Sequence, residues 1–272
     1  MRRRCSSVLL LAAALGASAC VGLSPVEEAR LGAQLHEQLL RERALLADPV
    51  VEHYVDDIGR RVLRAAPDEA FDYRFFVLVD DEINAFTAPG GYVYVNTGTL
   101  LRVRDAAELA GVIAHEVGHV ERRHVSENVA RRRAVGVVRQ VGVVAAGVAA
   151  GPAAAGAASL LGGVASLAAL NSFGREAERE ADEFAVEILP RAGYDPEGLV
   201  TFFQTLQREG GAAPPAFLSS HPATQERIEE TERLVAALPS RAGLRTDDGG
   251  RLEIIQRRIR LLTDTAEVPA GP

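Results

Sequence analysis

The feature that most constrains this chain is the sequence HEVGH at residues 115–119, which falls inside a predicted helix. Asp105, with Glu108 three residues later, is a capping signal that starts this helix at Ala106. Successive residues of a helix turn by about 100°, so the two histidines lie about 40° apart, one turn from each other. Two imidazoles in that arrangement can bind the same metal ion. The helix therefore predicts a metal site at His115 and His119.

The same helix keeps its histidines away from its core face, because its apolar residues lie on the opposite side. Gly111 and Gly118 face the same way as the histidines and leave room for another chain or an ion. Glu116 lies to one side, where it can reach a metal-bound water without being a ligand. His124 falls on the apolar face and is interpreted as a structural residue of the core.

A catalytic zinc ion needs a third protein ligand and an open position for water. The predicted helix at 175–190 offers many acidic residues, and one stripe of them fits a solvated face: Glu176, Glu180, Glu183 and Glu187. Glu178 and Asp182 instead lie within the apolar arc, where a carboxylate is costly unless it is paired or holds a metal ion. We therefore expect Glu178 to complete a site for one Zn²⁺ per chain, with Asp182 fixing a histidine tautomer. A buried ion pair or a helix cap is the alternative interpretation.

The remaining pattern is that of an α+β domain that is predominantly helical. Two segments rich in β-branched and aromatic residues, 73–79 and 92–96, predict strands of a small sheet, with a turn-rich stretch between them. Capping residues and helical periodicity predict helices at 25–46, 49–66, 106–131, 175–190, 196–208, 222–238 and 251–262. We expect a single domain over 20–272, of which 240–272 is a C-terminal extension.

Four motifs follow one another along the chain: NAFTAPGGYVYVNTGTL, HEVGH, Glu178-x-x-x-Asp182 and SSHPATQERI. Together they resemble the HtpX/BepA-type zinc metallopeptidases of peptidase family M48, over about residues 25 to 238. The chain is most similar to the small secreted or lipoprotein members of the periplasmic branch. The resemblance implies a zincin-like fold, zinc on His115, His119 and Glu178, and Glu116 as general base on a zinc-bound water.

The resemblance also places His221, which precedes Pro222, near the metal. Two roles stay open for this histidine: it stabilises the transition state, or it occupies the open zinc position as a latch. Arg227 is a further candidate neighbour of the site, although a surface salt bridge uses arginine equally often.

A peptide substrate is expected to bind as an extended strand along the edge of the 92–96 strand, by backbone pairing. The residues expected to shape that cleft are Asn84, Phe86, Gly90, Tyr92 and Tyr94. An ordinary hairpin without a binding role is the alternative interpretation of this segment.

The first nineteen residues have a charged head, a short apolar run and a tail of small residues, which is typical of a bacterial secretory signal peptide. The tail resembles a lipobox, so Cys20 is the expected lipid attachment site, and ordinary signal cleavage predicts the same cut between Ala19 and Cys20. An uncleaved anchor is the third possibility. Val21 after the cysteine favours the outer membrane over the inner membrane as the location of the anchored protein.

The stretch 140–174 has no charged residue and is rich in alanine and glycine. Pro152 divides it into two pieces that are poor in leucine and isoleucine, so membrane insertion would be weakly driven. We favour two packed helices near the cleft over a membrane-contacting or gating hairpin, and over a membrane span.

The overall charge excludes one class of partner and leaves two functions. With 37 acidic and 30 basic residues the net charge is -7, which gives no attraction to nucleic acid. We expect a zinc endopeptidase on the periplasmic side of the cell envelope, lipid-anchored to a membrane, that cleaves misfolded or unassembled envelope proteins. The alternative is a metal-bound chaperone or assembly factor with latent protease activity, working with envelope assembly machinery.

Overall fold

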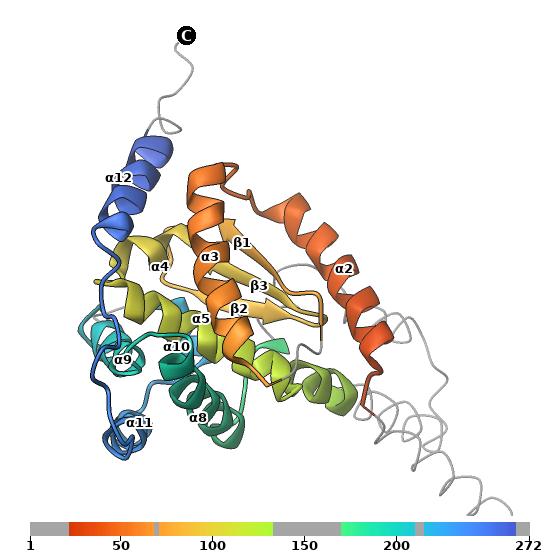
Figure 1. Cartoon of the computed structure of the whole chain (residues 1–272). Coiled ribbons are helices and arrows are strands. Elements are labelled where there is room, and N and C mark those ends of the chain that lie inside the picture. The colour runs from red at the N-terminus through yellow and green to blue at the C-terminus, as the bar shows by residue number, and fades with distance from the viewer. Residues whose placement is uncertain (1–21, 68–70, 133–169, 210–214, 265–272) are drawn as a thin grey trace, which may run out of the picture.

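The computed structural model describes residues 22–67, 71–132, 170–209 and 215–264. In these ranges, helices surround a three-stranded sheet (Figure 1). The predicted signal peptide, Cys20 and residues 140–169 of the uncharged stretch lie outside the described residues. The helices are α2 Pro25–Glu42, α3 Pro49–Ala65, α4 Thr97–Arg102, α5 Ala106–Glu121, α8 Arg175–Arg191, α9 Glu197–Glu209, α10 Ala216–Ser220, α11 Gln225–Ala236 and α12 Arg251–Asp264. The predicted α+β, predominantly helical fold is confirmed.

Side-chain caps start several of these helices where the sequence predicts them. Ser24 and Glu27 form a capping box at α2, with Pro25 in the first turn. Asp105 accepts a hydrogen bond from the backbone N–H of Glu108 at the start of α5. The start predicted at Pro222 is wrong, because Thr224 caps α11 and the short α10 precedes it.

The sheet contains β1 Arg74–Leu78, β2 Ala85–Ala88 and β3 Tyr92–Asn96, in the order β1-β3-β2. β1 pairs with β3 in parallel, and β2 pairs with β3 antiparallel. The stretch before 92, predicted to be turn-rich, thus contains a strand. β3 is the central strand, so the predicted edge at 92–96 is wrong and β2 is the edge on that side.

Alternate residues of β3 pack into two hydrophobic clusters, as the period of a strand requires. Val93 and Val95 contribute to the larger cluster, which includes the apolar faces of α3 and α5. Tyr92 and Tyr94 contribute to the smaller one, built on α2. The sheet therefore separates α2 from the α5 side of the domain.

Two glycines let neighbouring helices approach α5 closely. A Cβ on Gly111 would lie 2.9 Å from the backbone nitrogen of Leu199 in α9. A Cβ on Gly118 would lie 3.2 Å from the Cα of Ala181 in α8. The room predicted beside these glycines is filled by two helices, one of which carries Glu178.

The helix predicted to run unbroken from 106 to 131 is interrupted after Glu121. Arg123 has a φ of 60°, in the left-handed region that a residue with a side chain rarely adopts. Its guanidinium donates hydrogen bonds to the carbonyl of Leu23 and to Glu28, which hold this conformation. Helical structure resumes at His124, which is thereby turned away from the position that a straight helix would give it.

The described part of the C-terminal extension belongs to the domain. Leu252, Ile255 and Ile259 of α12 are buried in the larger cluster. Arg258 bonds to Asp48, at 2.7 Å between Nε and Oδ1, and Asp48 caps α3 by accepting from Val50 and Val51. In the described ranges, none of the helices combines the length and apolar character that crossing a membrane requires.

Replacing Asp48 tests this junction. The hydrogen bond from Arg258 lowers the pKa of Asp48 in the folded protein. The ionised carboxyl therefore stabilises the fold above its unfolded pKa of about 3.9, and this stabilisation is lost as pH falls through the lower folded value. Asp48→Ala removes the cap as well and should lower the free energy of unfolding at pH 7 by about 1–2 kcal/mol.

Urea unfolding at pH 7 and at acidic pH measures the effect. Asp48→Asn is the matched control, because it keeps a capping oxygen and loses only the charge. Its deficit relative to the wild type should vanish on acidification, whereas that of Asp48→Ala should persist. Equal stability of all three proteins at pH 7 would show that the junction contributes nothing.

Candidate metal centre

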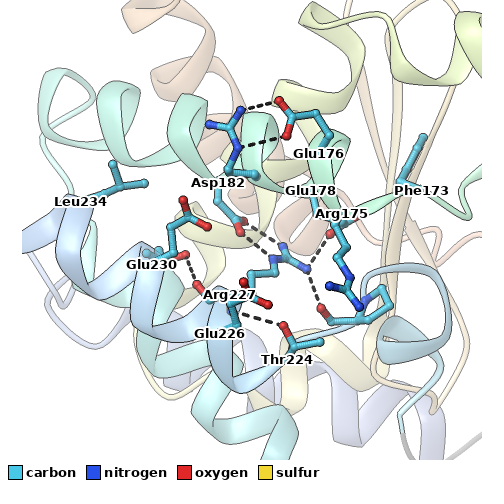
Figure 2. Close-up of a pocket in the computed structure, with 13 residues that line it drawn as sticks. Phe173, Arg175, Glu176, Glu178, Asp182, Thr224, Glu226, Arg227, Glu230 and Leu234 are labelled. Atoms are coloured by element: carbon cyan, nitrogen blue, oxygen red, sulfur yellow. Dashed lines mark hydrogen bonds and ion pairs between the residues drawn. The ribbon is translucent and has the colours of Figure 1, made fainter.

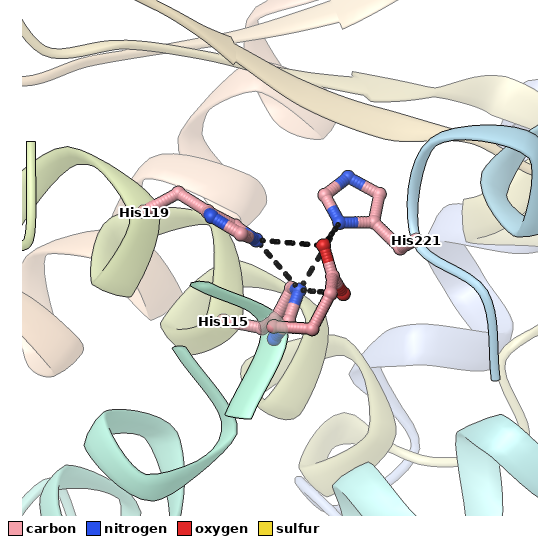
Figure 3. A group of neighbouring side chains, drawn as sticks. His115, His119 and His221 are labelled. Carbon is pink, nitrogen blue, oxygen red and sulfur yellow. Dashed lines mark hydrogen bonds and ion pairs between the residues drawn. The ribbon is translucent and has the colours of Figure 1, made fainter. Parts of the chain in front are cut away.

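The two histidines of α5 converge on one point (Figure 3). The Nε2 atoms of His115 and His119 lie 3.1 Å apart, and both side chains are fully buried. α5 is packed on several sides, by α3, α8, α9 and the sheet, so the helix is a rigid support for both rings. The structure therefore brings the predicted pair together in the geometry of two ligands to one ion.

Glu178 of α8 and His221, which follows α10, complete the cluster. Glu178 lies 3.6 Å from His115 Nε2 and 3.5 Å from His119 Nε2, through its two oxygens. The Nδ1 of His221 lies 3.0 Å from Glu178 Oε1 and 3.3 Å from His115 Nε2. One ligand atom from each of the four residues lies within 4.8 Å of the others.

Asp182 and Arg227 contact these ligands on the side away from the point where the ligand atoms meet (Figure 2). Asp182 Oδ1 lies 2.9 Å from His115 Nδ1, one turn of α8 after Glu178. Arg227 points from α11 toward α8 and bonds to both carboxylates, at 2.5 Å from Glu178 Oε2 and 2.5 Å from Asp182 Oδ2. Both tentative neighbours from the sequence thus lie beside the ligands, and an exposed salt bridge does not describe Arg227, which is buried.

The charged groups of the cluster shift one another's pKa values. Burial would raise the pKa of Glu178, yet His221 and Arg227 hold it well below its usual range. Burial would lower the pKa of His115, yet its bonds to Asp182 and Glu178 raise it. Burial, reinforced by His115 and His221, lowers the pKa of His119. The site thus stabilises carboxylates close to imidazole nitrogens, as a cation site requires.

Glu116 lies beside the cluster rather than in it. Its Oε1 is 3.4 Å from His221 Nε2, and neither of its oxygens has a hydrogen-bond partner in the described part of the chain. Burial raises the pKa of this carboxyl group to about 8. A buried carboxyl with no partner is costly for a fold, so its retention points to a chemical task.

The donor set fits a zinc ion. Imidazole nitrogens and a carboxylate oxygen are ligands that zinc prefers, with two histidines and a glutamate leaving one further position. Asp182 beside Nδ1 of His115 leaves that ring's Nε2 to face the ion. His115, His119 and Glu178 would hold the metal, and His221 Nδ1 lies where a fourth ligand would.

Two cavities lie in the described part of the domain, and one of them borders the cluster. One, of 420 Å³, lies between α8 and α11 and is lined by Glu178, Asp182 and Arg227 among others (Figure 2). The other, of 430 Å³, lies on the β2 side and is lined by Asn84, Phe86 and Ser220 among others. The first cavity thus borders Glu178, whereas the second is lined by Ser220, the residue before His221 in the chain.

The predicted substrate residues divide into two groups. Asn84 and Phe86 line the cavity at β2. Tyr92 and Tyr94 lie on the central strand with their side chains in the α2 cluster, and Tyr94 bonds to His36 at 2.8 Å. Gly90 is in the turn between β2 and β3, with a φ of 80°, against Ala29 of α2. The structure does not bring these last three to the metal cluster.

Two residues that contact His119 were missed by sequence reasoning. Phe173 stacks on the ring of His119, with 3.9 Å between the ring centroids. His124, interpreted as structural, lies with its Nδ1 2.9 Å from Nδ1 of His119. The helix break at Arg123 puts it there, and the sequence HVERRH carries no glycine or proline to announce that break.

Comparison with known proteins agrees with this geometry. The chain is 33% identical over 208 residues to a putative beta-barrel assembly-enhancing protease of Vibrio cholerae, covering 74% of this chain and 42% of that protein. It is 30% identical over 220 residues to the beta-barrel assembly-enhancing protease of Escherichia coli, covering 79% and 45%. The chain thus spans less than half the length of these relatives.

A third relative is the metalloprotease YcaL of Escherichia coli, 30% identical over 161 residues that cover 59% of this chain and 61% of that protein. The model of the family described as peptidase family M48 matches residues 49–235, which include every member of the metal cluster. The predicted resemblance is confirmed, and the chain belongs to peptidase family M48.

Proposed function

We propose that this protein is a zinc-dependent endopeptidase of the bacterial cell envelope. One observation carries the proposal: ligand atoms of His115, His119 and Glu178 meet in a buried cluster, beside the carboxyl of Glu116, which has no hydrogen-bond partner among the described residues. Three protein ligands with a neighbouring carboxylate base are the arrangement of a hydrolytic zinc site. Membership of a peptidase family makes the peptide bond the expected substrate.

The chain's own residues divide the work of peptide hydrolysis. Zinc bound here would polarise the scissile carbonyl and lower the pKa of a water molecule. Glu116 in its ionised form, which a bound cation would favour, accepts the proton from the attacking water and returns it to the leaving amine nitrogen. Asp182 holds the ring of His115, and Arg227 holds Asp182 and Glu178, so that the metal-facing atoms keep their positions.

The substrate backbone is proposed to pair with β2 rather than with β3. The carbonyl of Asn84 accepts from the N–H of Asn96, so Asn84, Phe86 and Ala88 direct their backbone groups to β3. Ala85 and Thr87 then direct theirs outward, and the Thr87 carbonyl accepts from the side chain of Asn171 at 2.9 Å. An extended peptide can bond to the same outward groups.

The setting of the activity is proposed from the sequence and the relatives. The secretory signal at 1–19 and Cys20 support a lipid-anchored protein on the periplasmic side, with the outer membrane favoured. Two relatives are named for the assembly of β-barrels, which supports misfolded or unassembled envelope proteins as substrates and the assembly machinery as a partner.

A second function is favoured by the position of His221. Its Nδ1 lies among the metal-facing atoms, where it would occupy the position that water needs. With that position filled, the protein would hold a client without cutting it. We therefore propose that His221 is a latch, and that an assembly role with latent protease activity is the resting state of the same site.

Replacing Glu116 tests the enzyme. Glu116→Gln removes the proton acceptor and leaves every ligand in place. Zinc content should stay at one ion per chain, while cleavage of casein, compared in the wild type and in the His221→Ala background without the latch, should fall by about 10²- to 10⁴-fold. Zinc is measured by elemental analysis and cleavage by gel and mass spectrometry. Glu127→Gln, at an exposed position after the helix break, is the matched control and should cleave like the wild type. A wild type free of metal, or a variant that still cleaves, contradicts the proposal.

Replacing His221 tests the latch. His221→Ala should keep the zinc ion, because three ligands remain, and should raise the rate of casein cleavage. A histidine that stabilises the transition state predicts the opposite, a slower variant. His53→Ala, which removes an exposed histidine of α3, is the control for general effects of the substitution.

A further inference from the structure

We propose that His124 and Glu180 are positioning residues that hold His119 in the tautomer and ring orientation required for metal binding. The inference rests on the proposed zinc site. Three side chains form a continuous chain of contacts, with 2.9 Å between the Nδ1 atoms of His119 and His124 and 3.0 Å between His124 Nε2 and Glu180 Oε2. His119 and His124 are buried, and Glu180 lies at the surface end of the chain.

The proton positions follow from which atoms are free to donate. His119 faces the metal cluster with Nε2, and a metal ligand needs a lone pair there, so its proton must be on Nδ1. Nδ1 of His119 then donates to Nδ1 of His124, which must be the bare nitrogen of that ring. The proton of His124 is therefore on Nε2, where it donates to the carboxylate of Glu180. One tautomer of each ring satisfies every contact.

The orientation of the His119 ring is set in two ways. Phe173 stacks on its face at an angle of 15° between the ring planes, which fixes the tilt of the imidazole. The bond to His124 fixes its rotation within that plane, because it engages the nitrogen opposite the metal-facing one. Together these contacts aim Nε2 at the point that His115 and Glu178 also face.

The helix break at Arg123 lies between His119 and His124 and makes their contact possible. In an unbroken helix, residues 119 and 124 would lie about 140° apart on the wheel, too far around for their rings to meet. The left-handed Arg123 redirects the chain, and its guanidinium is anchored by Leu23 and Glu28. A strained residue held by tertiary contacts is a feature of functional sites. The break thus gives His119 a supporting group, as Asp182 of α8 does for His115.

Zinc affinity separates this role from simple filling of the core. The dissociation constant is measured by competition with a chelator for the wild type and for His124→Leu, which fills the space without an acceptor. Loss of such an orienting partner typically weakens metal affinity about 10- to 100-fold, and we expect a change in that range for His124→Leu. His124→Asn keeps an acceptor near the position of Nδ1 and should recover most of the affinity.

Glu180, at the outer end of this chain of contacts, is tested by a variant and a matched control. Glu180→Ala should weaken zinc binding by a smaller factor, since water can replace an acceptor that is 39% exposed. Glu183→Ala removes an equally exposed carboxylate of α8 that pairs with Arg179, and should leave the affinity unchanged. Circular dichroism and thermal unfolding show whether each variant is folded.

A spectroscopic measurement on the unaltered protein does not depend on folding of a variant. Long-range ¹H–¹⁵N correlation spectra of the zinc-loaded protein should show His119 protonated on Nδ1 and His124 protonated on Nε2. The inference is overturned if His124 carries its proton on Nδ1, or if a folded His124→Leu protein binds zinc as tightly as the wild type. Failure of the wild type to bind zinc would instead overturn the proposed function, so the two failures are distinct.

Discussion

The burial of three carboxylates beside three histidines is the constraint on which the rest of this structure depends. Glu116, Glu178 and Asp182 are at most 3% exposed, and isolated charges at such positions would cost several kcal/mol each. Arg227 offsets two of them, and imidazoles contact all three. A cation at the centre would balance the remainder, so the fold is best understood as a support for a metal ion.

That support comes from helix packing more than from the sheet. Glycines at 111 and 118 bring α9 and α8 against α5, so Glu178 and Asp182 lie one turn apart along the same side of α5 as its histidines. α11 then supplies Arg227 across the two carboxylates. α5, α8 and α11 are far apart in sequence, yet α5 supplies the two histidines, α8 the two carboxylates and α11 the arginine. Any change in their spacing moves ligands and supporting groups together.

Much of the centre could be predicted from the sequence, because helical periodicity converts spacing into direction. The pairing of His115 with His119 and the separation of Glu178 from the solvated glutamates follow from 100° per residue. Periodicity also explains one error: it assumed that the helix continues past Arg122, so it misplaced His124. The interruption depends on tertiary contacts of Arg123 with Leu23 and Glu28, which local pattern does not contain. β2 was missed because four residues beside proline and glycine carry too little alternation to indicate a strand.

The proposed steps of holding a client and cutting it would involve different parts of this geometry. The proposed pairing of a peptide with the outward groups of β2 would replace the bond between Asn171 and the Thr87 carbonyl, a bond in which His221 takes no part. Under the proposed latch, cleavage would require more, because His221 would also have to leave its position between His115 and Glu178. The free-energy cost of releasing His221 depends on its bond to Glu178. The free energy of peptide binding depends on the edge strand β2. The proposed binding along β2 and the proposed latch at His221 therefore rest on different residues, so one could operate without the other.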